Sequence, residues 1–132
     1  LPAGERRIHA LVDAETRIAA DVGSFRAFFE ILPHVLRDDE LRPRVARLYE
    51  GYRDTVLRSL GDVGPERATR LRAHAMLTIA IVDGLAIQRS LDPDHVGIVA
   101  ATELWERLLS ASLAEAGGRG DPPGGAGQGE GA

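Results

Sequence analysis

The stretch from Glu66 to Leu91 places the strongest constraint on how this chain folds. Its middle, from Ala75 to Ile87, is apolar at almost every position, and a helix that is apolar on all sides must be surrounded by protein. Asp83 and Arg89 interrupt the apolar run, which is therefore too short for a bilayer span of roughly 20 apolar residues. The stretch predicts the central helix of an all-α domain, in contact with its own chain on one side and with a second copy on another.

The ends and the faces of this central helix can be predicted as well. Gly64-Pro65 stops the preceding segment, and Asp92-Pro93 ends the helix because the residue before a proline resists the helical conformation. A projection at about 100° per residue places four residues on one face: Met76, Ile79, Asp83 and Ala86. A second face is rich in small residues, which permit close approach of another helix: Ala73, Leu77, Ala80 and Gly84.

Length and composition limit the class of protein. The chain has 132 residues, enough for one domain with one core. It has no cysteine, which excludes disulfides and thiolate metal sites, and its net charge of −4 argues against this segment binding a phosphate backbone by itself. Because no signal peptide or membrane-spanning run is present, we expect a cytoplasmic protein without a membrane partner. The chain begins Leu-Pro rather than with Met, so we expect that an N-terminal part is missing.

Four further helices complete an expected bundle of about five. Apolar residues at helical spacing predict helices over 5–21, from Ser24 to the mid-30s, over 40–60 and from about 94 to 114. We expect Ser24 to cap the second of these helices and Pro33 to kink it near Leu32. Gly and Pro dominate from Gly117 onward, so we predict a domain over 1–116 and a disordered tail over 117–132.

The last predicted helix is apolar over about half of its circumference, more than the ~100° that one core contact requires. Left in water, this arc would be an exposed patch of the kind that monomers avoid. We therefore predict a homodimer through the central and last helices. The predicted interface residues are Ala73, Leu77, Ala80, Gly84, Ala101, Leu104, Trp105 and Leu108.

Three sequence stretches are similar to a known family. AIVDGLAIQRSLDPD, followed by ATELWERLL, resembles the C-terminal half of TetR-family (tetracycline-repressor-like) transcription regulators. The preceding FRAFFEILPHVLRDDELRPRVARLYEGYRDTVLRSL also resembles their ligand-domain helices, and the similarity covers about Glu5 to Ala114. The resemblance implies an effector-binding and dimerisation domain in which the last two helices of each subunit form a four-helix bundle. Family members carry an N-terminal helix-turn-helix that binds operator DNA. No such module precedes Glu5, so we expect DNA binding only through an N-terminal domain that is not present here.

Aromatic and polar residues on three of the predicted helices suggest a ligand site. The aromatic side chains either fill a core, as such stripes usually do, or line a cavity, as the resemblance implies. Asp83, a carboxylate on an apolar face, must be hydrogen-bonded, paired or protonated. Its partner is either a bound ligand or a structural group such as an arginine or a backbone group. The predicted ligand-binding residues are Phe28, Phe29, Leu32, Tyr49, Tyr52, Met76, Ile79 and Asp83.

Nothing in the sequence predicts a metal site or catalytic residues. Four histidines are scattered along the chain without the spacing of a helical metal site, and we expect no cofactor: His9, His34, His74 and His95. A small helical enzyme is an alternative, built from Asp83 with His74, Tyr49 and Tyr52. A structural dimerisation module with a filled core is another. The leading hypothesis is the dimeric sensing domain of a transcription regulator, a repressor that a small apolar effector releases from DNA by a population shift.

Overall fold

The computed structural model describes residues 3–61 and 64–118, with side chains as far as Glu115. This part of the chain folds into five α-helices and has no strand, which confirms the predicted fold class. The helices are α1 (Ala3–Ala20), α2 (Val22–Arg37), α3 (Leu41–Ser59), α4 (Pro65–Leu91) and α5 (Ile98–Gly118). The predicted tail over 117–132 lies outside the described residues, except for Gly117 and Gly118, which end α5.

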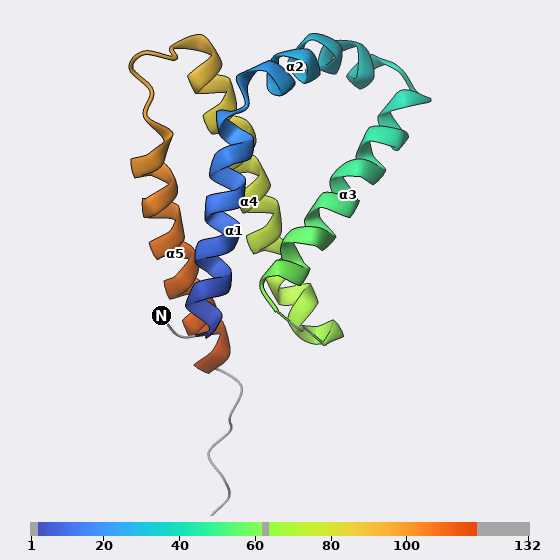
Figure 1. Ribbon diagram of the computed structural model, residues 1–132. Coiled ribbons are helices and arrows are strands. Elements are labelled where there is room, and N and C mark those ends of the chain that lie inside the picture. The colour runs from blue at the N-terminus through green and yellow to red at the C-terminus, as the bar shows by residue number, and fades with distance from the viewer. Residues whose placement is uncertain (1–2, 62–63, 119–132) are drawn as a thin grey trace, which may run out of the picture.

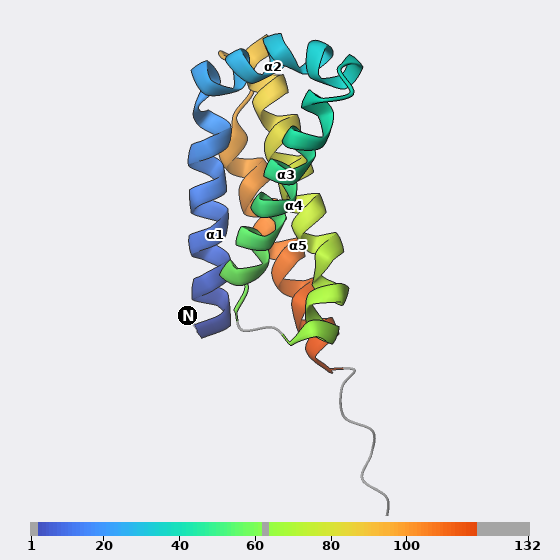
Figure 2. The same cartoon turned by 90° about the vertical axis from the view of Figure 1, so that its right-hand side faces the viewer.

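The helices form a bundle with one element that runs sideways. α1, α4 and α5 lie side by side, α2 extends sideways from the upper end of α1, and α3 returns toward the lower end of α4 (Figure 1). The view from the side shows α3 running along α4 (Figure 2), in agreement with the packing of these two helices. α1 packs against α5, α4 and α3, whereas α2 contacts only α3 and α4 extensively. α1 and α4 are therefore each packed against several helices, whereas α2 packs mainly against two.

α4 begins and ends where the sequence predicts. Gly64 precedes it in an extended conformation, Pro65 occupies its first turn, and Asp92 follows its last residue. By length and composition α4 also passes for a membrane span, contrary to the expectation that Asp83 and Arg89 make it too short. In the fold, however, α4 contacts all four other helices, so we interpret it as the core helix of the domain.

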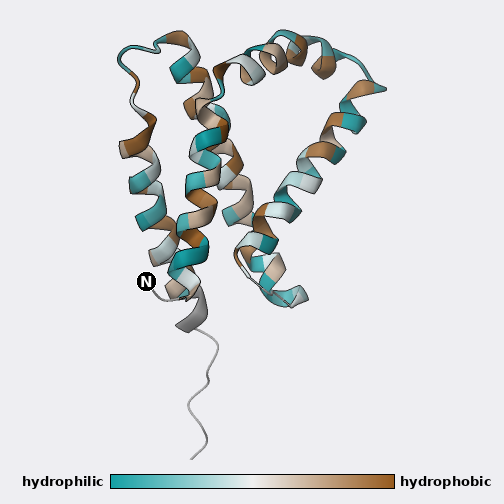
Figure 3. Ribbon diagram, viewed as in Figure 1, coloured by the Kyte–Doolittle hydropathy of each residue, from teal (hydrophilic) through white to brown (hydrophobic). Residues whose placement is uncertain are grey.

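Two clusters of buried side chains hold the bundle together. Hydrophobic and hydrophilic residues alternate along α1, α2 and α3 as expected for amphipathic helices (Figure 3). The larger cluster joins α1, α3, α4 and α5 and consists of Ile8, Leu11, Val12, Val56, Leu57, Leu71, Ala75, Ile79 and Leu109. The smaller cluster joins α1, α4 and α5 near the α2 end and consists of Ala19, Val82 and Ile98.

Two local predictions differ from the structure. Asp21, not Ser24, caps α2: its carboxylate accepts from the backbone N–H of Ser24 at 3.3 Å and from the Ser24 hydroxyl at 2.8 Å. Pro33 lies inside α2, which runs on to Arg37, and a kink at this proline stays a prediction. α5 begins at Ile98 rather than near residue 94, because residues 92–96 form a turn of their own, closed by the bond from Val96 N–H to the Asp92 carbonyl.

One face of α4 is apolar and largely exposed in the part of the chain that the structure describes. The face spans most of the helix, and we refer to it as the α4 stripe: Ala73, Met76, Leu77, Ala80, Gly84, Ile87 and Leu91. Leu77 is 55% exposed and Leu91 is 81% exposed. On α5, Leu104 and Leu108 are also about half exposed. The described residues of one copy therefore cover α4 on some sides only.

Candidate functional site

A cavity of about 310 Å³ lies between α2, α3 and α4, and we refer to it as the main chamber. α2 and α3 contribute apolar and aromatic side chains, while α4 contributes the single charged one. The lining consists of Phe25, Phe28, Ile31, Val45, Leu48, Tyr49, Tyr52 and Asp83. Leu48 is 72% exposed and stands at the mouth, so the chamber is open to solvent. An apolar wall with few polar groups is the usual composition of a small-molecule site.

A second, smaller cavity of about 170 Å³ lies between α3 and α4, and we refer to it as the side chamber. Its lining consists of Tyr49, Arg53, Met76, Ile79, Ala80 and Asp83. Tyr49 and Asp83 therefore border both chambers.

The two shared residues are bonded to each other. The Tyr49 hydroxyl donates to Oδ2 of Asp83 at 2.8 Å, which joins α3 to α4 between the chambers. Burial raises the pKa of Asp83, and the bond from Tyr49 lowers it in part. Burial, together with this carboxylate acceptor, also raises the pKa of Tyr49, so its hydroxyl stays protonated and remains a donor. The structural partner of Asp83 is thus a tyrosine, and neither an arginine nor a backbone group.

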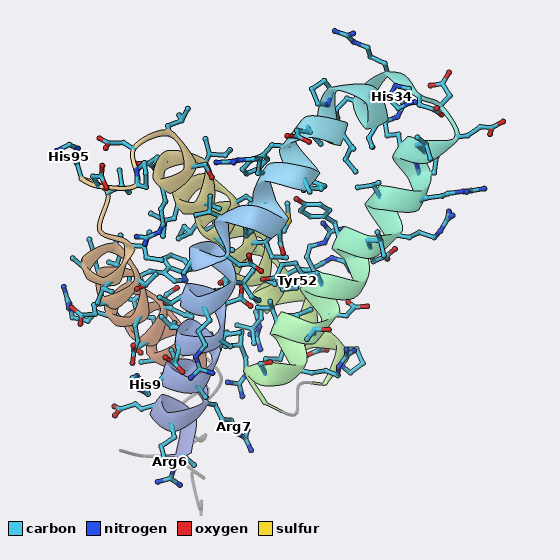
Figure 4. The ribbon with its side chains drawn as sticks, turned by 45° about the horizontal axis from the view of Figure 1, so that its top comes forward. Arg6, Arg7, His9, His34, Tyr52 and His95 are labelled. Carbon is cyan, nitrogen blue, oxygen red and sulfur yellow. The ribbon has the colours of Figure 1, made fainter. Side chains whose placement is uncertain are left out.

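A second tyrosine–carboxylate pair lies next to the first. The Tyr52 hydroxyl donates to Oε2 of Glu15 on α1, and Glu15 is only 6% exposed. Figure 4 shows Tyr52 near the centre of the bundle. Burial raises the pKa of Glu15 most, and the charge of Asp83 raises it further. None of the ion pairs among the described residues involves Glu15 or Asp83, so two carboxyl groups face the interior without a cation.

Aromatic rings tie α2 to this network. The Phe28 ring centroid lies 6.2 Å from that of Tyr49, and Phe29 lies behind it with centroid distances of 6.0 Å to Phe28 and 5.6 Å to Phe25. These tilted contacts are within the range that aromatic pairs prefer. Three of these rings, from Phe25, Phe28 and Tyr49, line the main chamber.

This geometry, an open apolar cavity in an all-α domain, agrees with the comparison to known proteins. The sequence model of the family described as BetI-type transcriptional repressor, C-terminal, matches residues 4–114. The chain belongs to this family. It is therefore a TetR-type C-terminal domain, as the resemblance implies, and not an enzyme. No curated protein and no solved structure matches the chain.

The BetI-type domain brings most of the predicted ligand residues together. Phe28, Tyr49, Tyr52 and Asp83 line the main chamber, while Met76 and Ile79 line the side chamber. Two predicted residues line neither chamber: Phe29, which supports Phe25 and Phe28, and Leu32.

Four residues of the main chamber are absent from the predicted set: Phe25, Ile31, Val45 and Leu48. Each lies three or four positions from a predicted residue on the same helix. These four residues could therefore have been predicted from the helical repeat of apolar residues along α2 and α3.

The eight predicted dimer residues lie on α4 and α5 of this repressor domain and differ in exposure. On α4, Ala73, Leu77 and Ala80 are exposed and Gly84 is partly exposed. On α5, Leu104 and Leu108 are exposed, while Ala101 and Trp105 are partly buried.

The histidines of the BetI-type domain are dispersed. His9, His34 and His95 lie at different corners of the molecule (Figure 4). His9 contacts Glu106 at 3.0 Å, His95 contacts Asp92 at 2.7 Å, and His74 contacts Ser112 at 2.8 Å. Among the described residues, no three His, Asp or Glu side chains are grouped so that they could hold a metal ion. His74 therefore points to α5 and does not join Asp83, Tyr49 and Tyr52.

A larger cavity of this domain, about 500 Å³, lies between α1 and α5. Its lining is charged and polar: Glu5, His9, Glu103, Glu106, Arg107 and Ser110. Three carboxylates, a histidine, an arginine and a serine make up this wall, whereas the main chamber has a single charged residue, so we place the candidate site in the main chamber despite its smaller volume.

Proposed function

We propose that this BetI-type repressor domain binds a small apolar effector in the main chamber and that binding releases the repressor from DNA. Repressors of transcription work inside the cell, and we propose a cytoplasmic location. The observation that carries the proposal is the main chamber itself, an open cavity with seven apolar or aromatic lining residues and one carboxylate. The sequence left open whether these side chains fill a core, and the cavity supports the alternative that they bind a ligand.

Asp83 narrows the chemistry of the effector. Its present partner, the neutral hydroxyl of Tyr49, bonds only Oδ2, so a ligand can donate to Oδ1 or replace Tyr49 at Oδ2. A ligand that displaces Tyr49 without donating a hydrogen bond leaves a buried acceptor unsatisfied, at a cost of about 1–3 kcal/mol. We therefore propose an apolar molecule that carries a hydrogen-bond donor group, in preference to a pure hydrocarbon or an anion.

The proposed mechanism is a population shift. An effector that binds one arrangement of α2, α3 and α4 more tightly than another favours that arrangement. The shift would move the DNA-reading heads of the dimer out of register with successive major grooves. A coupling free energy of about 1–3 kcal/mol is typical of such allostery and is sufficient here.

The same proposal includes a homodimer through α4 and α5. The α4 stripe together with Leu104 and Leu108 on α5 exposes several large apolar side chains, which is unusual for a monomer in water. A two-fold axis would bury this surface on both copies at once. Trp105, partly buried at its edge, is a candidate anchor because interface energy concentrates in such residues.

Thermal unfolding in the presence of small apolar compounds, with and without a donor group, tests the effector proposal. A ligand at about 100 times its Kd stabilises the folded state by about 2.7 kcal/mol. We expect a rise in Tm for compounds with a donor, its loss in Leu48→Trp, which blocks the mouth, and its retention in Arg47→Trp on the neighbouring exposed position. A structural module without a ligand site would show no rise in Tm with any compound. Equal rises in Tm for both variants would show that the compounds bind outside the main chamber.

A further inference from the structure

We propose that the effector site has two compartments and that it takes an elongated amine with an aryl group at one end and an aliphatic tail at the other. The aryl group lies in the main chamber, the nitrogen donates to Asp83, and the tail enters the side chamber. The inference rests on the proposed function, because it extends the same site through the Tyr49–Asp83 pair.

The partition between the chambers is a single hydrogen bond. Tyr49 and Asp83 are the two residues that line both cavities, and the 2.8 Å bond between them spans the gap from α3 to α4. In this arrangement a ligand N–H donates to Oδ2 of Asp83 and takes the place of the Tyr49 hydroxyl. Rotation of the Tyr49 side chain then leaves an opening, so one molecule can occupy both cavities.

The two chambers differ in the chemistry of their walls. Phe25 and Phe28 give the main chamber aromatic surfaces that match a planar ring. The α4 wall of the side chamber, from Met76, Ile79 and Ala80, is aliphatic and suits a flexible hydrocarbon tail. Arg53 completes the side chamber as a polar rim toward α3.

The charge at the junction favours a protonated nitrogen over a neutral donor. Asp83 and the nearby Glu15 take part in none of the ion pairs found within residues 3–61 and 64–118. Arg53, the one basic side chain that lines either chamber, also takes part in none of these ion pairs, so it does not neutralise Asp83. A secondary ammonium group would supply a positive charge at Asp83 and two N–H donors.

Titration calorimetry with benzylamine, N-butylbenzylamine and N-hexylbenzylamine tests the inference. Burial of one methylene is worth ≈ 0.8 kcal/mol, so affinity should rise about three- to fourfold per methylene that enters the side chamber. Ala80→Phe places a ring in the side chamber. We expect this variant to bind benzylamine as the wild type does and to lose the gain from the longer tails. Met76→Trp, one helical turn away, should have the same effect and serves as an independent second variant.

Ala73→Phe is the matched control. Ala73 lies on the same exposed α4 stripe as Ala80 but lines neither chamber. The Ala73→Phe variant therefore shows the effect of a new phenyl ring on this stripe without a change in the side chamber. Retention of the tail-length gain in this control supports the side chamber, and its loss overturns the inference. Equal affinities of the three amines for the wild type also overturn it and leave the main chamber as the effector site. Absence of binding by all three amines overturns both the site and its extension.

Discussion

The hydroxyl of Tyr49 donates to Oδ2 of Asp83 across the junction of α3 and α4, and neither residue has a charged partner there. A neutral donor satisfies the carboxylate without neutralising it, so Asp83 remains a strong acceptor for a ligand that carries a better donor. The same pair separates the main chamber from the side chamber. The bond therefore joins α3 to α4, and a ligand can compete with the Tyr49 hydroxyl for Asp83.

The stability of the domain should depend on the ionisation of Asp83 and Glu15. Burial raises the pKa of both carboxyls, so the folded state binds more protons than the unfolded state. The free energy of unfolding should consequently fall as pH rises from the ordinary carboxyl range near ~4 through the raised pKa values. Asp83→Asn and Glu15→Gln should each remove part of this fall, as measured by urea unfolding over a pH series.

Asp38→Asn provides a control of opposite sign. Backbone N–H groups of Leu41 and Glu40 donate to Asp38 and lower its pKa, so its contribution is lost as pH falls through that pKa. The advantage of the wild type over this variant should shrink toward acid pH. Parallel pH profiles for the wild type and the Asp83 and Glu15 variants would contradict the assigned burial of these two carboxyls.

Tyr52→Phe should destabilise the domain at neutral pH. The substitution removes the donor to Glu15 and leaves a buried carboxylate unsatisfied, at a cost of about 1–3 kcal/mol. In a Glu15→Leu background there is no acceptor to leave unsatisfied, so the same substitution should cost much less. A double-mutant cycle measured by urea unfolding gives this coupling directly, and additive effects would show that the bond contributes nothing.

Leu71→Ala should be among the most damaging core substitutions. Leu71 is 1% exposed in the larger buried cluster, where truncation of a leucine costs about 2–5 kcal/mol. Leu48→Ala makes the same chemical change at a largely exposed position and should stay within about 0.5 kcal/mol. Chemical denaturation of both variants checks the contrast, and similar losses would mean that Leu48 is covered in solution.

Gly84→Leu should prevent the proposed dimer without harming the subunit. A Cβ atom at this position meets nothing within 4 Å, and replacing a mid-helix glycine gains up to about 1 kcal/mol of helix propensity. Any loss of association then reports a clash with a second copy. Sedimentation velocity at micromolar concentration should show a dimer for the wild type and a monomer for the variant.

Two further variants complete the sedimentation experiment. Gly51→Leu, equally open but on α3, should remain dimeric. Leu108→Glu places a charge on a side chain that is 54% exposed in the subunit, so it should fold but not associate. A monomeric wild type would contradict the proposed dimer. A Gly84→Leu variant that remains dimeric would show that the interface lies on another face.

Periodicity and chain-breaking residues predicted the helices well, because both act locally. Pro65 and Asp92-Pro93 delimit α4 as expected. The start of α5 was wrong by several residues. Asp94 is a good capping residue in the sequence, but in the structure the chain after Leu91 first forms a turn that depends on specific bonds at Asp92. Ser24 and Asp21 are both good capping residues, and only the backbone geometry decides between them.

The candidate site was predicted in part, for a related reason. The aromatic and acidic residues on α2, α3 and α4 could be identified one helix at a time. The pairing of Tyr49 with Asp83, and of Tyr52 with Glu15, depends on how far α3 slides along α1 and α4. A helical projection contains no information on that offset, so the sequence left the partner of Asp83 open.

Asp83 and Gly84 are consecutive residues of α4: the first borders both chambers, and the second lies on the exposed α4 stripe. Within a regular helix their directions differ by a fixed ~100°, so the helix cannot turn one without turning the other by the same angle. A ligand that rolls α4 by pulling on Asp83 must therefore reorient the surface around Gly84 immediately, with no intervening loop or hinge to absorb the motion. The response to the ligand and the geometry of the dimer would then depend on the same rotation of α4. A substitution that restricts this rotation should reduce both the response to the ligand and the change in the dimer.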